Sequence, residues 1–282
     1  MLSGWLFWSL AAALTWGVGQ VAAKKGLSYF SPLAYNIFST LIELPIFLPF
    51  ALWLGLDLPR FKVFDFLILI FIASTYLIFF YVISLGEISL TGTVLASYPL
   101  STIFFSTIFL GEKLSLPQLF FALIIIAGVG LIGFPRKLLD LRSEKWFWLA
   151  VFSAILVGFS DFLAKYVLGR VGEGNYFFFY PFAFIPGLFL SLLLDRKGRY
   201  LPQVKPRLWL WALTGVTLEI LGVLFFFLAF ARGPASLAGP VSSSYAAITV
   251  ILALFFLGEK MSKIQAVGVT LTVLGIILIG LW

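Results

Sequence analysis

The sequence predicts an all-α integral membrane protein with ten transmembrane helices arranged as two inverted five-helix repeats. Three observations support this fold class: an apolar composition, a series of apolar segments of membrane-spanning length, and an internal repeat. Of the 282 residues, 62% are hydrophobic and 11% are charged. A soluble domain has roughly 25% charged residues, and a mean hydropathy of +1.10 would leave a water-exposed surface largely apolar. We therefore expect lipid to surround most of the chain.

Apolar segments recur along the chain, and each is close to the roughly 20 residues that a helix needs to cross the hydrocarbon core. Charged residues, glycine and proline separate them. The expected spans are 4–23, 32–55, 64–85, 89–110, 116–134, 146–167, 175–194, 207–230, 236–257 and 263–281. The first segment has no basic region before it and no small-residue cleavage pattern after it, so we interpret it as the first span rather than a signal peptide.

The composition also excludes several kinds of chemistry. The sequence contains neither cysteine nor histidine, which rules out disulfides and removes the usual protein ligands of zinc, haem and iron–sulfur clusters. We therefore expect no metal site and no cofactor. The net charge of +7 comes from Lys and Arg in short loops between apolar segments, where such residues orient membrane proteins. We expect no nucleic-acid partner.

An internal repeat divides the chain into two halves. The segment FLGEKLS at Phe109–Ser115 returns as FLGEKMS at Phe256–Ser262, 147 residues later. At the same offset, Ser97–Tyr98 matches Ser244–Tyr245. Towards the N-terminus the offset is 141 residues. The matches at this second offset are Gly17 with Gly158, Ala23–Lys24 with Ala164–Lys165, Tyr35 with Tyr176, and Pro45 with Pro186.

The two halves are expected to have opposite orientations in the membrane. Each contains five spans, so the second half enters from the other side, and a pseudo-two-fold axis in the membrane plane relates the halves. The expected boundaries are 1–134 for the first unit, 135–145 for the connecting loop and 146–282 for the second, inverted unit. Inverted repeats are typical of secondary transporters, because equivalent halves that exchange conformations open a central site to alternate sides. A duplicated membrane protein with a structural or enzymatic role is the alternative.

These repeated segments resemble the drug/metabolite transporter superfamily, EamA type. The resemblance is carried by LTWGVGQVAAKKGL at Leu14–Leu27, by Ile88–Ser115 and by its partner Ala235–Ser262. The segments GVGLIGF and GIILIGL also fit, so the resemblance covers nearly the whole chain. It implies ten helices, a central cavity between the halves, and transport of small organic solutes without ATP. Members handle amino acids, nucleobase-like compounds, choline, sugar phosphates or drugs. The sequence has no G-x-x-x-x-G-K-[ST] phosphate-binding loop, which agrees with a secondary mechanism.

The distribution of Lys and Arg gives an expectation for the orientation. The face that carries both termini has 6 of the 19 basic residues, and the opposite face has 13. This count predicts that both termini lie outside the cell, whereas members of the family are more often drawn with both termini inside. We expect a multi-pass protein of the inner (plasma) membrane, in contact with membrane lipids. The sequence leaves open whether it is a monomer or a homodimer.

Three carboxyl side chains fall inside the expected spans, where a charge costs several kcal/mol. They are Glu43, Asp161 and Glu219. In the first span Gln20 and Lys24 are four residues apart and share a helix face, and Asp161 and Lys165 repeat this arrangement at the 141-residue offset. We consider Lys24, Glu43 and Lys165 candidate coupling or gating residues. The alternatives are that the lysines extend to the interface, that Asp161 only neutralises Lys165, and that a protonated carboxyl binds a neighbouring helix.

Aromatic and hydroxyl side chains provide the rest of the expected binding site. Trp16 lies one turn before the polar pair of the first span, and Tyr98 and Tyr245 are repeat equivalents set among small hydroxylated residues that line polar cavities. Pro99 and Pro240 interrupt the helical hydrogen bonds nearby and free carbonyl groups. The candidate substrate-binding residues are Trp16, Gln20, Tyr76, Ser97, Tyr98, Asp161, Tyr180, Glu219, Ser244 and Tyr245.

The first, third, fourth, sixth, eighth and ninth spans are expected to line this cavity. Aromatic rings with carboxylates favour a cationic amine, lysines with hydroxyls favour a carboxylate or phosphate, and an amino acid would use both. The sequence therefore predicts a secondary active transporter of a small organic metabolite, with an amino acid or other amphipathic amine as first candidate and the proton as candidate coupling ion. A sugar-phosphate, nucleotide or organic-anion exchanger of the same superfamily is the alternative.

A membrane-embedded lipid-processing enzyme is an alternative of a different class. Such an enzyme would need a catalytic cluster at the interface, and the loops offer only Arg, Lys and scattered Glu. We therefore expect no enzymatic activity. The FLGEK segments are interpreted as the ends of the fourth helix in each half, since Gly111 and Gly258 tolerate the left-handed conformation that terminates a helix. Their Glu–Lys pairs are expected to hold these turns in the headgroup zone, with no role in binding.

Overall fold

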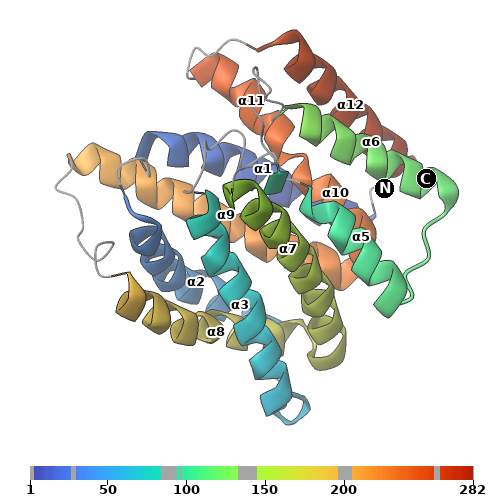
Figure 1. Ribbon diagram of the computed structural model, residues 1–282. Coiled ribbons are helices and arrows are strands. Elements are labelled where there is room, and N and C mark those ends of the chain that lie inside the picture. Colours follow the sequence, from blue (N-terminus) through green and yellow to red (C-terminus); the bar gives the residue numbers. More distant parts are fainter. Residues whose placement is uncertain are drawn as a thin grey trace.

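The computed structural model describes residues 3–26, 30–83, 94–95, 97–132, 145–195, 205–256 and 261–281, and these are almost entirely helical. Residues 135–144 of the connecting loop, the beginning of the expected fourth span and residues 257–260 of the second FLGEK segment lie outside this set. Figure 1 shows the helices packed around one another in a single bundle. The architecture is the ten-helix membrane fold of two inverted five-helix repeats that the sequence predicts.

The first half contributes five spans. Its described helices are α1 (Gly4–Gly26), α2 (Pro32–Leu54), α3 (Val63–Ile83), α5 (Tyr98–Phe109) and α6 (Leu116–Ile132), with a short 3₁₀ turn η2 (Leu58–Arg60). Ser31 caps α2 by accepting a hydrogen bond from the Ala34 N–H at 3.0 Å. Pro32 follows at the first helical position, where its missing N–H needs no partner. The expected start of this span at residue 32 is therefore explained by local sequence.

The second half contributes the other five spans. Its described helices are α7 (Lys145–Val171), α8 (Glu173–Leu194), α9 (Pro206–Arg232), α10 (Ala235–Ser243), α11 (Tyr245–Phe256) and α12 (Lys263–Gly280). α7 continues beyond its expected end at residue 167 as far as Val171, and Arg170 in its last turn forms an ion pair with Asp65 of α3. Gly172, with φ of +84°, then ends the helix. Arg170, three residues beyond the expected end of this span, therefore belongs to the helix rather than to the following loop.

The fourth and ninth spans each contain a turn at equivalent positions. Ser244 separates α10 from α11, and α5 begins directly after a turn at Ser97. Pro240 lies inside α10 one turn before its end, where the absent N–H weakens the helical hydrogen bonds. Pro99 lies at the second position of α5. Interrupted helices of this kind border the binding sites of secondary transporters.

The two halves contact each other in a pattern that follows the pseudo-two-fold axis. α1 packs along α9, and its equivalent α7 packs along α3, which is the equivalent of α9. α1 also contacts α11, as α7 contacts α5. α2 packs against its own equivalent α8, and α6 packs against its own equivalent α12, which Figure 1 shows side by side. Each half thus supplies the same contact surfaces to the other.

Glycines allow α6 and α12 to approach each other closely. A Cβ atom placed on Gly128 would lie 2.5 Å from Thr272 Oγ1 and 2.7 Å from the Gly268 carbonyl oxygen. A Cβ atom on Gly268 would lie 2.6 Å from the Gly128 carbonyl oxygen. Small residues of this kind let helix backbones pack directly against each other in membranes.

Gly128→Ala is expected to lower the free energy of unfolding by about 1–3 kcal/mol, because the added methyl group has no space between the helices. Gly130→Ala is the matched control on the same helix, with nothing within 4 Å of the added Cβ. It should leave the melting temperature unchanged or raise it slightly. Thermal unfolding of both variants in one detergent makes the comparison, and equal melting temperatures would contradict a tight α6–α12 contact.

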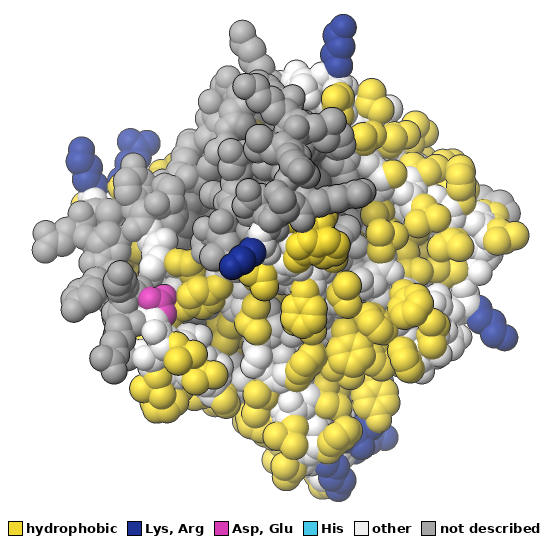
Figure 2. Space-filling model, viewed as in Figure 1, with side chains coloured by type: hydrophobic (Ala, Val, Ile, Leu, Met, Phe, Trp, Pro, Cys, Tyr) yellow, Lys and Arg dark blue, Asp and Glu magenta, His cyan; other side chains and the backbone are white. Residues whose placement is uncertain are grey.

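Apolar side chains cover the outside of the bundle. Six of the described helices are long and apolar enough to cross a membrane. Figure 2 shows hydrophobic side chains over most of the described part of the visible face, with most of the visible Lys and Arg at its edges. Large side chains such as Trp53, Leu116 and Phe255 are largely exposed. A soluble monomer rarely exposes so much apolar surface, and lipid tails solvate it, so the protein is a multi-pass membrane protein.

The turn of the first FLGEK segment connects the two halves. Gly111 has φ of +66° and ends the helix as expected. The Glu112 carboxylate accepts hydrogen bonds from the N–H groups of Ala235 and Ser236 at 2.8 and 2.9 Å, and from the Ser236 hydroxyl. It therefore caps the N-terminus of α10, where exposed N–H groups favour an anion. Glu112 therefore also joins the two halves, a role that its position in a turn between two spans does not indicate.

Candidate functional site

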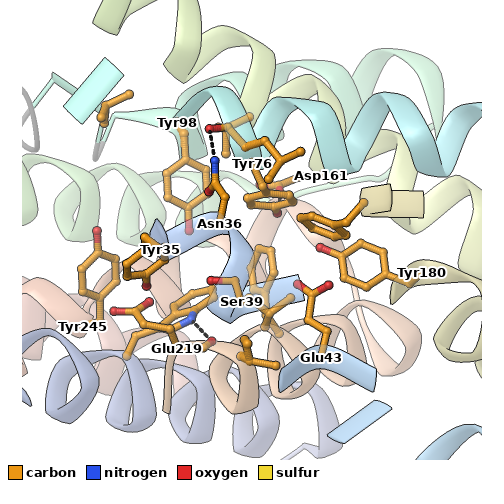
Figure 3. Close-up of a pocket in the computed structure, with 18 of the residues that line it drawn as sticks. Tyr35, Asn36, Ser39, Glu43, Tyr76, Tyr98, Asp161, Tyr180, Glu219 and Tyr245 are labelled. Atoms are coloured by element: carbon orange, nitrogen blue, oxygen red, sulfur yellow. Dashed lines mark hydrogen bonds between the residues drawn. The ribbon is translucent and has the colours of Figure 1, made fainter. Parts of the chain in front are cut away.

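A cavity of about 130 Å³ lies between the two halves. α1, α2, α3, α5, α7, α8, α9 and α11 all contribute side chains to its wall. Figure 3 shows carboxyl, amide and phenol groups from these helices around a common space. A cavity of this size holds several water molecules or a small organic solute. The sequence predicted that six spans line the cavity. The second and seventh spans, which correspond to α2 and α8, were not among them.

Repeat-equivalent positions form much of this wall. The equivalent pairs of which both members line the cavity are Trp16 and Val157, Gln20 and Asp161, Ser39 and Tyr180, Glu43 and Phe184, Tyr76 and Val223, and Tyr98 and Tyr245. Equivalent helix faces of the two halves therefore meet at the cavity. This is the arrangement expected when the pseudo-two-fold axis passes through its centre. In five of these six pairs the residue types differ, so the charged groups are distributed unevenly around it.

Glu219 of α9 is held from α1. Gln20 donates from Nε2 to Glu219 Oε1 at 2.9 Å, and Trp16 Nε1 donates to the Glu219 backbone oxygen, also at 2.9 Å. The two donors are one turn apart on α1, which packs along α9. The Trp16 ring also contacts Phe226 and Tyr245, with centroid distances of 5.2 and 5.8 Å. This carboxyl is thereby positioned beside a group of aromatic rings.

Asp161 of α7 is satisfied by hydroxyl groups of the first half. Thr102 donates from Oγ1 to Asp161 Oδ2 at 2.7 Å, and the Tyr76 hydroxyl donates to Oδ1 at 3.3 Å. The side chain is fully buried. Both carboxyl oxygens therefore have a donor within the protein, and these donors come from α5 and α3 rather than from α7 itself.

Lys165 is not the partner of Asp161, although the two share a helix face. Lys165 Nζ donates to the carbonyl oxygen of Gly233 at 2.9 Å and to that of Phe230. These carbonyls lie at the C-terminal end of α9, where oxygens without intrahelical donors attract cations. The alternative in which Asp161 only neutralises Lys165 is therefore wrong.

Glu43 of α2 has a buried carboxyl with incomplete hydrogen bonding. Glu43 is 4% exposed, and its Oε2 atom has no hydrogen-bond partner among the described residues. Asn36, two turns earlier on α2, donates from Nδ2 to the Leu77 carbonyl at 3.4 Å, while its Oδ1 has no partner in the same part of the chain. Buried acceptors without donors are uncommon. Both residues line the cavity, and these two oxygens are buried there without donors from the described residues.

Comparison with known proteins agrees with this architecture. The profile of the EamA-like transporter family matches residues 3–134 and 144–281. The chain belongs to this family. An uncharacterized transporter of Archaeoglobus fulgidus is 26% identical over 284 residues, which cover 96% of each chain. An uncharacterized protein of Methanocaldococcus jannaschii is 31% identical over 133 residues, which are 47% of this chain and 94% of that protein. One crystal structure covers 97% of this chain and 95% of its own, with a TM-score of 0.80 and 19% identity. That likeness shows the fold alone.

The cavity of this EamA-family protein brings together most of the residues that the sequence singled out. Those that line it are Trp16, Gln20, Tyr76, Tyr98, Asp161, Tyr180, Glu219 and Tyr245, together with the coupling candidate Glu43. Ser97 and Ser244 lie at the turns of the interrupted spans and are not among the lining residues. Ser97 Oγ donates to the Val94 carbonyl at 2.7 Å. The side chain of Lys24 falls outside the described part. The role of all these residues in binding stays a prediction.

The contribution of α2 was largely missed. Tyr35, Asn36 and Ser39 line the cavity, and sequence reasoning had used Tyr35 only to align the repeat. Asn36, Ser39 and Glu43 follow the i, i+3, i+7 spacing of one helix face. This row of polar residues in an apolar span was the signal that could have identified the face. The lining residues Phe184 and Phe226 gave no such signal in a chain with 33 Phe.

The charged side chains that line the cavity are all acidic in the described part of the wall. Glu43, Asp161 and Glu219 are present there, and no Lys or Arg is. Tyr, Trp and Phe side chains form much of the remaining surface. A buried carboxylate without a counter-charge is costly, and the faces of aromatic rings attract cations. The described wall of the EamA-family cavity therefore combines acidic and aromatic groups without a basic side chain.

Proposed function

We propose that this EamA-family protein is a secondary transporter that moves a small organic amine across the plasma membrane by alternating access, in exchange for protons. The supporting observation is the cavity wall, where carboxyls and aromatic rings from both halves face a common space without a basic side chain among the described residues. An ammonium group would neutralise a buried carboxylate and lie against the ring faces. Membership of a transporter family supports transport rather than enzymatic catalysis.

The cavity favours an amine over an anion. A carboxylate or phosphate group would need a cationic partner, and the Lys165 ammonium is already bound to carbonyl oxygens at the end of α9. An amino acid carries a carboxylate as well as an amine. Its carboxylate would need donors, and the Gln20 amide keeps only one of its two N–H groups after its bond to Glu219. We therefore place other amphipathic amines ahead of amino acids as solutes.

Contacts at one end of the bundle support alternating access. At the end that carries the chain termini, Glu112 of the first half binds the N-terminus of α10, and Asp65 of the first half pairs with Arg170 of α7. These contacts would have to break for the cavity to open at this end. The equivalent halves could exchange conformations to open the other end. The count of basic residues predicts that the end with the termini lies outside the cell.

Protons would compete with the amine for the carboxyls of the cavity. Either a bound proton or an ammonium group removes the cost of a buried, uncompensated carboxylate. Because Glu43, Asp161 and Glu219 line the same cavity, binding of one cation promotes release of the other. This competition couples proton entry to amine exit.

Uptake by proteoliposomes tests the proposed function. We expect a panel of radiolabelled primary amines to include one that enters vesicles with an acidic interior faster than vesicles without a pH gradient. Protein-free vesicles with the same gradient are the essential control, because neutral amines also cross bilayers unaided. Nigericin, which collapses the proton gradient, should reduce the protein-dependent rate. An unchanged rate would contradict proton exchange, and no protein-dependent uptake of any amine would contradict the assigned solute class.

A further inference from the structure

The three carboxyls of the cavity differ in how many hydrogen-bond donors they already have. Asp161 accepts from a hydroxyl group at each of its two oxygens. Glu219 accepts from Gln20 at Oε1, and Glu43 Oε2 has no donor among the described residues. An ionised carboxylate has about four acceptor sites. Glu43 and Glu219 are therefore the carboxyls that keep the most acceptor capacity for a ligand.

Glu43 and Glu219 lie at different ends of the cavity. Tyr35, near the beginning of α2, lies close to Glu219. Glu43 is eight residues further along α2, which is about 12 Å along the helix axis, and it lies close to Tyr180. Figure 3 shows Ser39 between the two carboxyls, with Tyr35 beside Glu219 and Tyr180 beside Glu43. The cavity therefore has an acidic group at each end.

Unused acceptors are present at both of these ends. Asn36 follows Tyr35 on α2 and so lies towards the Glu219 end, and its fully buried Oδ1 has no donor within the described chain. Glu43 Oε2 is the unused acceptor at the other end. Leaving a buried acceptor without a donor costs free energy that a ligand with an N–H group at that place would recover. Two such acceptors indicate a ligand with donors at both of its ends.

We propose that the solute is a linear diamine, bound with one ammonium group at Glu43 and the other at Glu219 and Asn36. This inference rests on the proposed function, because it names the class of amine that the same cavity takes. Two ammonium groups neutralise two buried carboxylates, which a single cation does not. The alkyl chain between them lies along the apolar and aromatic wall. The N–H groups meet acceptors that a trimethylammonium group, which has no N–H, leaves unsatisfied.

Isothermal titration calorimetry on the purified full-length protein in detergent tests this proposal. The probes are α,ω-diaminoalkanes from 1,3-diaminopropane to 1,8-diaminooctane, each compared with the monoamine of the same carbon number. We expect one chain length to bind about 10- to 100-fold more tightly than its monoamine, the gain from one charge-assisted hydrogen bond. The bis-trimethylammonium analogue of that diamine should bind about tenfold more weakly than the diamine.

Glu43→Gln tests the assignment of the second ammonium group. It should reduce the ratio of diamine to monoamine affinity by about tenfold or more. Glu173→Gln is the matched control, because its carboxylate pairs with Arg232 at 3.1 Å and does not line the cavity. The ratio should stay at the wild-type value in this control. An unchanged ratio in Glu43→Gln would overturn the assignment, and if that variant does not fold, the wild-type ligand series still decides.

The outcomes separate this inference from the proposed function. Equal affinities for monoamines and diamines at every chain length would overturn the diamine inference while leaving protein-dependent amine uptake in place. Tight binding of one chain length, with a loss of that preference in Glu43→Gln, would support it. Absence of both binding and uptake for every amine would overturn the diamine inference and the proposed function together.

Discussion

Glu219→Gln is expected to reduce amine uptake by about 10- to 100-fold, the effect of losing one charge-assisted hydrogen bond in the cavity. The substitution keeps the size of the side chain and an oxygen that can accept from Gln20, but it removes the negative charge. Trp16 binds the backbone oxygen of Glu219 rather than its carboxyl, so the packing of α1 on α9 should survive. The measurement is the initial rate of amine uptake by proteoliposomes, with the melting temperature recorded alongside.

Asp161→Asn tests whether Asp161 belongs to the same binding site. Thr102 and Tyr76 each donate to one carboxyl oxygen, and an Asn side chain accepts through only one atom because its other terminal group is a donor. We expect a loss of uptake of similar size and a weaker response to the proton gradient. Glu173→Gln, outside the cavity, should transport at the wild-type rate. If Glu219→Gln and Asp161→Asn both left uptake and its pH dependence unchanged, the site assignment would be wrong.

Glu112→Ala is expected to lower the free energy of unfolding by about 2 kcal/mol, because α10 loses its N-terminal cap and the first half loses a contact with the second. The same loss should favour opening of the cavity at this end of the bundle by about 30-fold. The chain contains no cysteine, so a single Ser39→Cys substitution reports on access to the cavity. An impermeant maleimide should label this cysteine faster when Glu112 is replaced.

Two controls isolate the role of the Glu112 carboxylate. Glu112→Gln keeps an acceptor for one N–H of α10 but not the charge, so both effects should be intermediate. Lys113→Ala removes an exposed side chain of the same turn and should change neither the melting temperature nor the labelling rate. A Glu112→Ala protein that melts and reacts like the wild type would show that this contact does not hold the halves together.

The helices and their pseudo-symmetry could be predicted from the sequence. The expected spans 32–55 and 263–281 agree with α2 and α12 to within one residue, because membrane thickness sets the length and polar residues mark both ends. The repeat offset paired Gln20 with Asp161, and both residues line one cavity. Such pairing requires no knowledge of packing, because an inverted repeat places equivalent positions around a common axis.

The partners of the polar side chains could not be predicted in this way. The spacing of Asp161 and Lys165 allowed an ion pair on α7, but each finds its partners on other helices. Glu112 belonged to a turn in the sequence, and its hydrogen bonds to Ser236 exist only because the fold brings α10 to it. Where a polar side chain can adopt two conformations, it adopts the one that pairs it with otherwise unsatisfied donors or acceptors of neighbouring helices.

The sequence by itself determined that this protein is a ten-helix membrane protein of two inverted halves, because composition, segment length and repetition are properties of the chain alone. Only the tertiary structure decided which face of α2 meets the cavity, and that Glu43 Oε2 and Asn36 Oδ1 are buried without donors among the described residues. The physical reason is that a hydrogen bond inside a membrane protein is completed by groups on other helices, and the distances to those groups exist only after the helices have packed.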